Sequence, residues 1–201
     1  MSAAFEDSEK TADCIDAVLL GVQSVAEQLR SDSALAISRA AELVHSAITS
    51  GNKILACGNG GSAAEAQHFI AELVGRFLTE REPLAGIALT VDTSVLTAVG
   101  NDYGYDEVFA RQVRALGNAG DVLVVLSTSG RSPNVLAALK QANERGLTTI
   151  ALVGKESNAD LDACDLVIAI PDQSTPRVQE MHLVILHLIC ELVDNALASG
   201  N

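Results

Sequence analysis

A glycine-rich turn between a short apolar run and a helical pattern constrains the fold more than any other feature of this chain. Residues 54–57 are apolar, as in a buried strand, and the turn GNGG follows at 58–61. From Ser62 on, apolar residues recur at helical spacing. Glycines permit close backbone approach to a ligand, Ser62 is a candidate helix cap, and the free N–H groups of a helix start favour a phosphate. The turn predicts an anion-binding loop or, with equal weight, a tight strand-to-helix connection.

The helix after this turn carries a pair of polar residues. His68 and Glu72 are four positions apart and therefore share one face. Such a pair can bind a metal or act as acid and base, although a solvated salt bridge is its more common role. The turn has neither the full dinucleotide fingerprint G-x-G-x-x-G nor the Lys-Ser/Thr of a P-loop. A Rossmann cofactor site and an NTPase site are therefore not supported.

Strand and helix patterns alternate along the rest of the chain. Strands are predicted at 54–57, 84–89, 121–126, 148–153 and 166–170, and helices from 62, at 95–99, at 106–116 and at 134–145. A polar loop is predicted at 100–105. The run at 121–126, DVLVVL, is typical of a strand buried on both faces of a parallel sheet. We therefore expect an α/β fold, a doubly wound parallel sheet with helices on both faces and ligands at the carboxyl ends of its strands.

A second candidate loop follows the central strand. Its sequence at 127–133, STSGRSP, leads into a helix in whose first turn Pro133 is tolerated. The loop offers four hydroxyl groups, those of Ser127, Thr128, Ser129 and Ser132. Hydroxyls beside a helix start at the end of a central strand predict a phosphate-binding site. A serine-rich capped turn without a ligand is the alternative.

Helical segments lie at both ends of the chain. Segments 11–29 and 33–49 are predicted to form an antiparallel pair, and the first of them needs an apolar partner such as a second copy of the protein. Residues 1–50 are accordingly separated as N-terminal helices with oligomer contacts, and 51–201 as the α/β domain. Segment 175–198 is apolar around most of its circumference, so we expect it to be buried, in the chain or in a subunit interface.

Three polar residues interrupt this last apolar helix. His182 is predicted to be a hydrogen-bonded core residue. Gln179 and His187 are about 12 Å apart along the helix axis, given a rise of about 1.5 Å per residue. They can meet one ligand only by leaning toward each other or by coming from different chains of an oligomer.

Charge and cysteine usage exclude several classes of function. The 201 residues carry a net charge of −13 at pH 7 and no basic run, which argues against direct binding of nucleic acid or of an anionic membrane. No apolar run approaches the roughly 20 residues of a membrane span. The four scattered cysteines predict reduced thiols, and no secretory signal is recognisable at the N-terminus. We expect a cytoplasmic protein.

Four motifs together resemble the sugar isomerase (SIS) domain family. They are GNGGS at 58–62, Asn101-Asp102, STSG at 127–130 with Ser132, and RVQEMH at 177–182. The resemblance covers nearly the whole chain and is strongest to the ketose–aldose isomerases of seven-carbon sugar phosphates. It implies a single flavodoxin-like SIS domain, a homotetramer with active sites shared between subunits, and cytosolic conversion of D-sedoheptulose 7-phosphate to D-glycero-D-manno-heptose 7-phosphate for lipopolysaccharide heptose.

The same resemblance implies a role for individual residues. The phosphate would be held by Ser127, Thr128, Ser129 and Ser132. The sugar would be lined by Asn59, Gly60, Gly61, Asn101 and Asp102, with Glu72 and Gln179 also in contact. One Zn²⁺ per subunit would be bound by His68, Glu72, Gln179 and His187, and Glu72 and His187 would be the catalytic acid/base pair.

Two alternatives remain open at the level of the sequence. A non-catalytic SIS protein that binds the DNA replication initiator shares much of these motifs, but Glu72 and His187 follow the isomerase version. Zinc coordination and proton transfer by His187 compete with each other, because a metal-bound histidine cannot titrate freely. The sequence does not decide between these two roles.

Overall fold

The structure, a computed structural model, describes residues 8–155, 161 and 163–200. The elements in chain order are α1 (Ser8–Asp32), α2 (Ala34–Thr49), β1 (Ile54–Gly58), α3 (Gly61–Val74), β2 (Gly86–Ala88), α4 (Thr93–Tyr103), the 3-10 helix η2 (Tyr105–Glu107), α5 (Ala110–Leu116), β3 (Val122–Ser127), α6 (Pro133–Glu144), β4 (Thr148–Val153), β5 (Leu166–Ala169) and α7 (Thr175–Ala198). All described strand pairs are parallel, in the order β2-β1-β3-β4-β5. This is the flavodoxin-like order, which confirms the predicted fold class.

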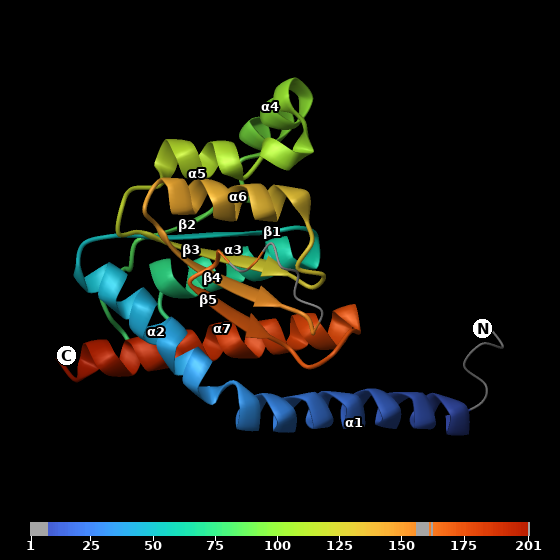
Figure 1. Cartoon of the computed structure of the whole chain (residues 1–201). Helices are drawn as coiled ribbons and strands as arrows, with labels where there is room; N and C mark the ends of the chain where they lie inside the picture. The colour runs from blue at the N-terminus through green and yellow to red at the C-terminus, as the bar shows by residue number, and fades with distance from the viewer. Residues whose placement is uncertain (1–7, 156–160, 162, 201) are drawn as a thin grey trace.

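The strands are continuously apolar because each packs against helices on both faces. Alternate residues of β3 point to opposite sides, with Val122 and Val124 in one core and Leu123 and Val125 in the other. One core is formed with α2, α3 and α7, and the second with α5 and α6. Figure 1 shows α5 and α6 above the sheet and α2 and α7 below it. The chain is thus a three-layer sandwich that leaves the strand ends accessible.

The first two helices are not the antiparallel pair that the sequence predicted. Only Ser33 separates α1 from α2, and its N–H still donates to the carbonyl of Leu29 at 3.0 Å. A single residue in near-helical conformation can bend the chain but cannot reverse it. In Figure 1, α1 extends beyond the α/β body and α2 continues at an angle in the same general direction.

Four local predictions were also wrong in detail. Asn101 and Asp102 belong to the last turn of α4, because this helix ends only before Gly104, where φ is +91°. At its start the helix is capped by the Asp92 carboxylate, which accepts the N–H of Val95 at 2.9 Å. The N-cap of α3 is Gly60, so Ser62 lies inside the helix. The predicted helix 106–116 is divided into η2 and α5, and β2 is shorter than the predicted strand 84–89.

The C-terminal helix α7 is buried on one side only. Its buried face packs against α2 and α3, whereas Val184, Leu188 and Leu192 are exposed on the other side. By length and composition α7 could cross a membrane, but core helices of soluble proteins pass the same test and 44% of its most apolar window is buried inside the fold. We therefore describe α7 as a core helix with an unpartnered apolar face.

Candidate functional site

The two glycine- and serine-rich loops lie side by side at the carboxyl ends of β1 and β3. These strands are neighbours in the sheet. The helices that follow them pack on opposite faces of the sheet, α3 after β1 on one face and α6 after β3 on the other. Such a switch point leaves a crevice in which α/β proteins bind ligands. Asn59 after β1 and Asn134 at the start of α6 exchange two amide hydrogen bonds of 2.8 Å across it. The structure therefore brings both predicted loops to one place.

The loop after β1 needs its glycines for two different reasons. Gly60 has φ of +57°, a conformation that side chains rarely adopt. A Cβ on Gly61 would lie 2.5 Å from Nε2 of Gln179, so this glycine makes room for the amide of Gln179 above the start of α3. Nε2 of Gln179 also donates to Oγ of Ser62 at 3.5 Å. Gln179 therefore lies against the start of α3, and its contact with a ligand of this loop stays a prediction.

The serine loop is held by its own hydroxyls. Oγ of Ser127 is 3.2 Å from Oγ of Ser132 and accepts the N–H of Gly130 at 3.1 Å, while Oγ of Ser129 accepts the N–H of Arg131 at 3.2 Å. A hollow of about 310 Å³ lies beside it, lined by Thr128, Ser129, Arg131, Lys155, Asp172, Gln173 and Thr175. Hydroxyls, a helix start and cations within reach suit a phosphate group.

A three-residue cluster forms where α3 packs against α7. Nε2 of His68 lies 2.9 Å from Oε1 of Glu72, and Nε2 of His187 lies 3.2 Å from Nε2 of His68. The possible ligand atoms of the three residues all lie within 4.8 Å of one another. Phe77 packs against the His187 ring, with ring centroids 5.3 Å apart. His187 thus reaches the pair on α3 within a single chain.

The donor set of this cluster fits zinc. Two imidazole nitrogens and a carboxylate oxygen are ordinary Zn²⁺ ligands, and three protein ligands with an open position are typical of catalytic sites. Gln179, the fourth residue of the expected ligand set, contacts Ser62 near the other end of α3, six residues and roughly 9 Å of helix before His68. A metal at the cluster would therefore be held by His68, Glu72 and His187, and Gln179 as a ligand stays a prediction.

Other predicted residues lie around the crevice with fewer contacts. Asn101 and Asp102 are exposed at the end of α4, where Nδ2 of Asn101 donates to Oδ1 of Asp102 at 2.7 Å. Just beyond them, the hydroxyl of Tyr105 donates to Oδ1 of Asn59 at 3.3 Å and links this end of α4 to the β1 loop. Sequence reasoning missed Tyr105 and Asn134, although Asn134 directly follows the STSGRSP loop. The sugar contacts of Asn101 and Asp102 stay predictions.

The cysteines of the two cores are not candidate nucleophiles. Complete burial raises the pKa of the Cys57 thiol at the end of β1 far above its usual range. Burial and the nearby charges of Glu72 and Asp194 raise the pKa of Cys190 to about 12. All four cysteines are free thiols, of which Cys57 and Cys190 are buried. The chemistry of the site therefore depends on its carboxylate, imidazoles, amides and hydroxyls.

Comparisons with known proteins show which family the chain belongs to. The family model of the SIS domain matches residues 20–154. A phosphoheptose isomerase from Rhodospirillum rubrum is 54% identical over 168 residues, which cover 84% of this chain and 89% of that protein. The chain belongs to the phosphoheptose isomerase family of SIS domain proteins. A second phosphoheptose isomerase, from Geobacter sulfurreducens, is 50% identical over 92% of this chain and 98% of its own length.

A solved structure extends the agreement to the fold. Phosphoheptose isomerase GmhA from Neisseria gonorrhoeae superimposes with a TM-score of 0.87 at 43% identity, covering 92% of this chain and 99% of that one. The predicted relationship to ketose–aldose isomerases within the SIS family is thereby confirmed. The alternative of a non-catalytic SIS protein is not favoured by these relatives.

Proposed function

We propose that the chain converts D-sedoheptulose 7-phosphate into D-glycero-D-manno-heptose 7-phosphate, with the His68–Glu72–His187 cluster as its catalytic centre. Membership of the phosphoheptose isomerase family makes the chain an isomerase of a phosphorylated sugar. The observation that carries the catalytic assignment is the contact of a carboxylate with one imidazole at 2.9 Å and of that imidazole with a second at 3.2 Å. These groups can move the protons that the reaction requires.

The reaction transfers two protons between neighbouring positions of the sugar. Glu72, a half-buried carboxylate, takes the proton from C1 of the ketose, and the C1–H electron pair forms the C1–C2 double bond of an enediol as the C2 carbonyl oxygen gains a proton. Glu72 then returns its proton to C2, and loss of the O1 proton leaves the C1 aldehyde. His187, whose ring nitrogen lies within 4.8 Å of the Glu72 carboxylate, can give a proton to O2 in the first step and take the O1 proton in the second. The reaction therefore needs no oxidant or reductant.

A metal at the same residues would supply a different form of assistance. Zn²⁺ bound by His68, Glu72 and His187, one per subunit, would polarise the sugar carbonyl as a Lewis acid. A ring nitrogen that binds metal cannot accept a proton, so the metal-loaded and acid/base roles of His187 exclude each other. The role of the chain's own residues in orienting the sugar is the same in both cases.

The serine loop would hold the phosphate end of the substrate, and the β1 loop would hold the sugar so that its reacting end reaches the cluster. The four hydroxyls of the serine loop, those of Ser127, Thr128, Ser129 and Ser132, are proposed to hold the phosphate. Asn59, Gly60, Gly61, Asn101, Asp102, Glu72 and Gln179 are proposed to contact the sugar. Because the cluster lies about 10 Å along α3 from the loop at its start, an extended seven-carbon chain suits the spacing better than a short one.

A homotetramer with shared sites is the proposed assembly, in which residues 1–50 supply contacts. Ile15, Val18, Leu19 and Leu20 on α1 are exposed, as are Val184, Leu188 and Leu192 on α7, and the two helices border an apolar hollow of about 370 Å³. An apolar hollow with exposed apolar residues on the helices that border it suits a protein interface. Light scattering of the wild type and of Leu19→Glu tests this assembly, with dissociation expected for the variant. An unchanged mass would argue against α1 as an interface.

The cytoplasm is the proposed location, because sugar phosphates are cytosolic metabolites and the thiols are free. The product would enter the synthesis of heptose for lipopolysaccharide.

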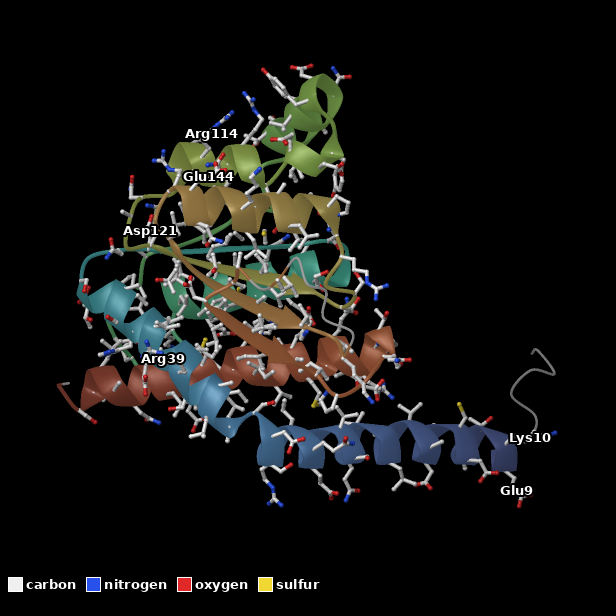
Figure 2. The ribbon with its side chains drawn as sticks, in the orientation of Figure 1. Glu9, Lys10, Arg39, Arg114, Asp121 and Glu144 are labelled. Atoms are coloured by element: carbon white, nitrogen blue, oxygen red, sulfur yellow. The ribbon has the colours of Figure 1, made fainter. Side chains whose placement is uncertain are left out.

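Direct assay of the purified protein tests the activity. Sedoheptulose 7-phosphate is incubated with the wild type, with Glu72→Gln and with Glu144→Gln. The last variant is a control, because Glu144 is an exposed carboxylate on α6 (Figure 2). Aldose formation is followed by NMR, with added zinc in one series and added chelator in another. Turnover that is lost only in Glu72→Gln supports the assignment, and its response to chelator separates the two roles of His187. No turnover from folded wild type in either metal state would favour binding of a replication initiator instead.

A further inference from the structure

A buried arginine closes the end of α3 directly at the proposed base. Arg81 lies in the segment after α3, and its side chain turns back so that Nη2 donates to the carbonyl of Glu72 at 2.8 Å and Nη1 to that of Leu73 at 2.9 Å. Carbonyls in the last turn of a helix lack helical partners and carry the negative end of its dipole, so a cation there is favourable. Arg81 thus fixes the backbone of Glu72 itself.

The same guanidinium is joined to α7. Nε of Arg81 donates to Oδ1 of Asp194 at 2.6 Å, and the hydroxyl of Thr79 donates to Oδ2 of Asp194 at 3.2 Å. The Arg81 side chain is 10% exposed and that of Asp194 3%. Charge-assisted hydrogen bonds between groups shielded from water are short and directional, so this pair holds its two elements at a defined spacing.

The place of Asp194 on α7 gives the pair its significance. Asp194 follows His187 by seven residues, which is about two helical turns, so both residues lie on the same side of α7. The pair therefore joins the α3 turn that carries Glu72 to the α7 face that carries His187. Cys190, a buried residue of α7, lies between His187 and Asp194 in the sequence.

The proposed centre depends on the relative position of these two helices. His68 and Glu72 come from α3 and His187 from α7, so a shift of one helix along the other changes every distance within the cluster. Apolar packing between α3 and α7 tolerates small sliding motions, whereas a guanidinium bonded to two carbonyls and a carboxylate does not. Displacements of about 0.5 Å are enough to weaken a catalytic or metal site.

We propose that Arg81 and Asp194 are positioning residues, whose buried ion pair sets the register of α3 against α7 and so holds Glu72, His68 and His187 in their working geometry. This inference deepens the proposed function and rests on it where turnover is the readout. The predicted effect on metal binding does not depend on the substrate. Loss of a residue that orients a metal ligand typically costs about 10- to 100-fold in metal affinity or activity.

Three variants test the proposal against a control. Asp194→Asn removes the charge at nearly constant shape, Arg81→Lys keeps the charge but cannot make the same set of bonds, and Asp194→Glu is the conservative variant. Arg39→Gln, which removes an exposed ion pair with Glu42 on α2, is the control (Figure 2). Each is titrated with Co²⁺, whose visible absorption reports the ligand geometry, and assayed well below its own melting temperature.

The expected result is a loss of function at constant substrate binding. Asp194→Asn and Arg81→Lys should bind Co²⁺ about 10-fold or more weakly and lose kcat by a similar factor, with KM within about twofold. Asp194→Glu should recover part of both, and Arg39→Gln should match the wild type. Variants that melt earlier but keep wild-type Co²⁺ affinity, spectrum and kcat would overturn the proposal, because the pair would then only stabilise the fold.

Failure of the proposed function gives a different result. If the wild type does not turn over the sugar phosphate, the kinetic comparison is lost for all proteins, but the Co²⁺ titration still compares variants with wild type. Should Arg81→Lys fail to fold, Asp194→Asn alone still decides the matter by the same titration.

Discussion

The Nε2 atoms of His68 and His187 lie 3.2 Å apart, although 119 residues separate them in the chain. At this distance the two nitrogens either share one proton or bind one metal ion, because two N–H donors facing each other would repel. Glu72 completes the arrangement at 2.9 Å from the same atom of His68. The contact between α3 and α7 is therefore the structural basis of the site.

Replacing His187 by Gln should weaken zinc binding at least about 10-fold, because one of the three clustered donors is lost. The bound metal is measured by mass spectrometry after equilibrium dialysis, with His45→Gln on α2 as a control for the loss of a histidine outside the cluster. Equal zinc contents in wild type and His187→Gln would show that the metal, if bound, is held elsewhere.

Replacing Ser129 by Ala should raise KM about five- to tenfold and leave kcat within about twofold, because a hydroxyl that holds the phosphate contributes equally to ground state and transition state. Steady-state kinetics at saturating and limiting substrate provide the test. Ser38→Ala, at an exposed serine on α2, is the control. A fall in kcat at unchanged KM would assign Ser129 to the reacting end of the sugar instead.

The parts of the fold that could be predicted from the sequence are those with local signals. The continuous apolar run of β3 and the glycine turn after β1 identify buried parallel strands and their loops, and the alternation with helices gives the layers. Both loops were therefore correctly predicted to lie at the carboxyl ends of strands. The polar residues around Asn101 were predicted to form a loop, although they belong to α4. The signal that supports this helix, the N-cap at Asp92, lies at its other end.

The parts that could not be predicted depend on contacts between distant segments. The angle between α1 and α2 is set by packing, because Ser33 carries no turn signal strong enough to specify a direction. The pair of Arg81 and Asp194 consists of two ordinary charged residues 113 positions apart, and only the fold brings them together. His187 was selected by resemblance, whereas its contact with His68 in one chain is a result of the structure.

Replacing either Glu65 or His182 by leucine should lower the free energy of unfolding by about 1–3 kcal/mol. Each replacement leaves the other polar group buried without its neighbour. His182 was predicted to be a hydrogen-bonded core residue. His182 is completely buried, but among the described residues neither of its ring nitrogens has a hydrogen-bond partner. Its Nδ1 atom lies 3.8 Å from Oε2 of Glu65, and this oxygen atom is also buried without a hydrogen bond. The two residues are therefore expected to depend on each other.

A double-mutant cycle measures this dependence. Glu65→Leu, His182→Leu and the double variant are unfolded in urea, and the double variant should lose at least about 1 kcal/mol less stability than the sum of the single variants. Costs that add to within about 0.3 kcal/mol would show that the two groups do not interact.

Asp121 should stabilise the fold at neutral pH and lose this effect in acid. The residue lies at the amino-terminal edge of the sheet (Figure 2), where its carboxylate accepts from Lys53 Nζ at 2.5 Å, from Lys53 N at 3.0 Å and from Asn118 N at 2.8 Å. Burial alone would raise the pKa of Asp121, but the hydrogen bonds from Lys53 and Asn118 and the charge of Lys53 outweigh it and lower the pKa below its usual value.

The sign of the pH dependence follows from this lowered pKa. The unfolded chain takes up the proton near the usual pKa of about 3.9, before the folded chain does, so the stabilisation is complete above that pH and is lost as the pH falls through the lower folded-state pKa. Asp121→Asn should therefore cost about 2 kcal/mol at pH 7, and the difference from wild type should shrink below about pH 4. Urea unfolding of both proteins between pH 3 and pH 7 measures it, and a difference that stays constant over this range would mean that the charge of Asp121 contributes nothing.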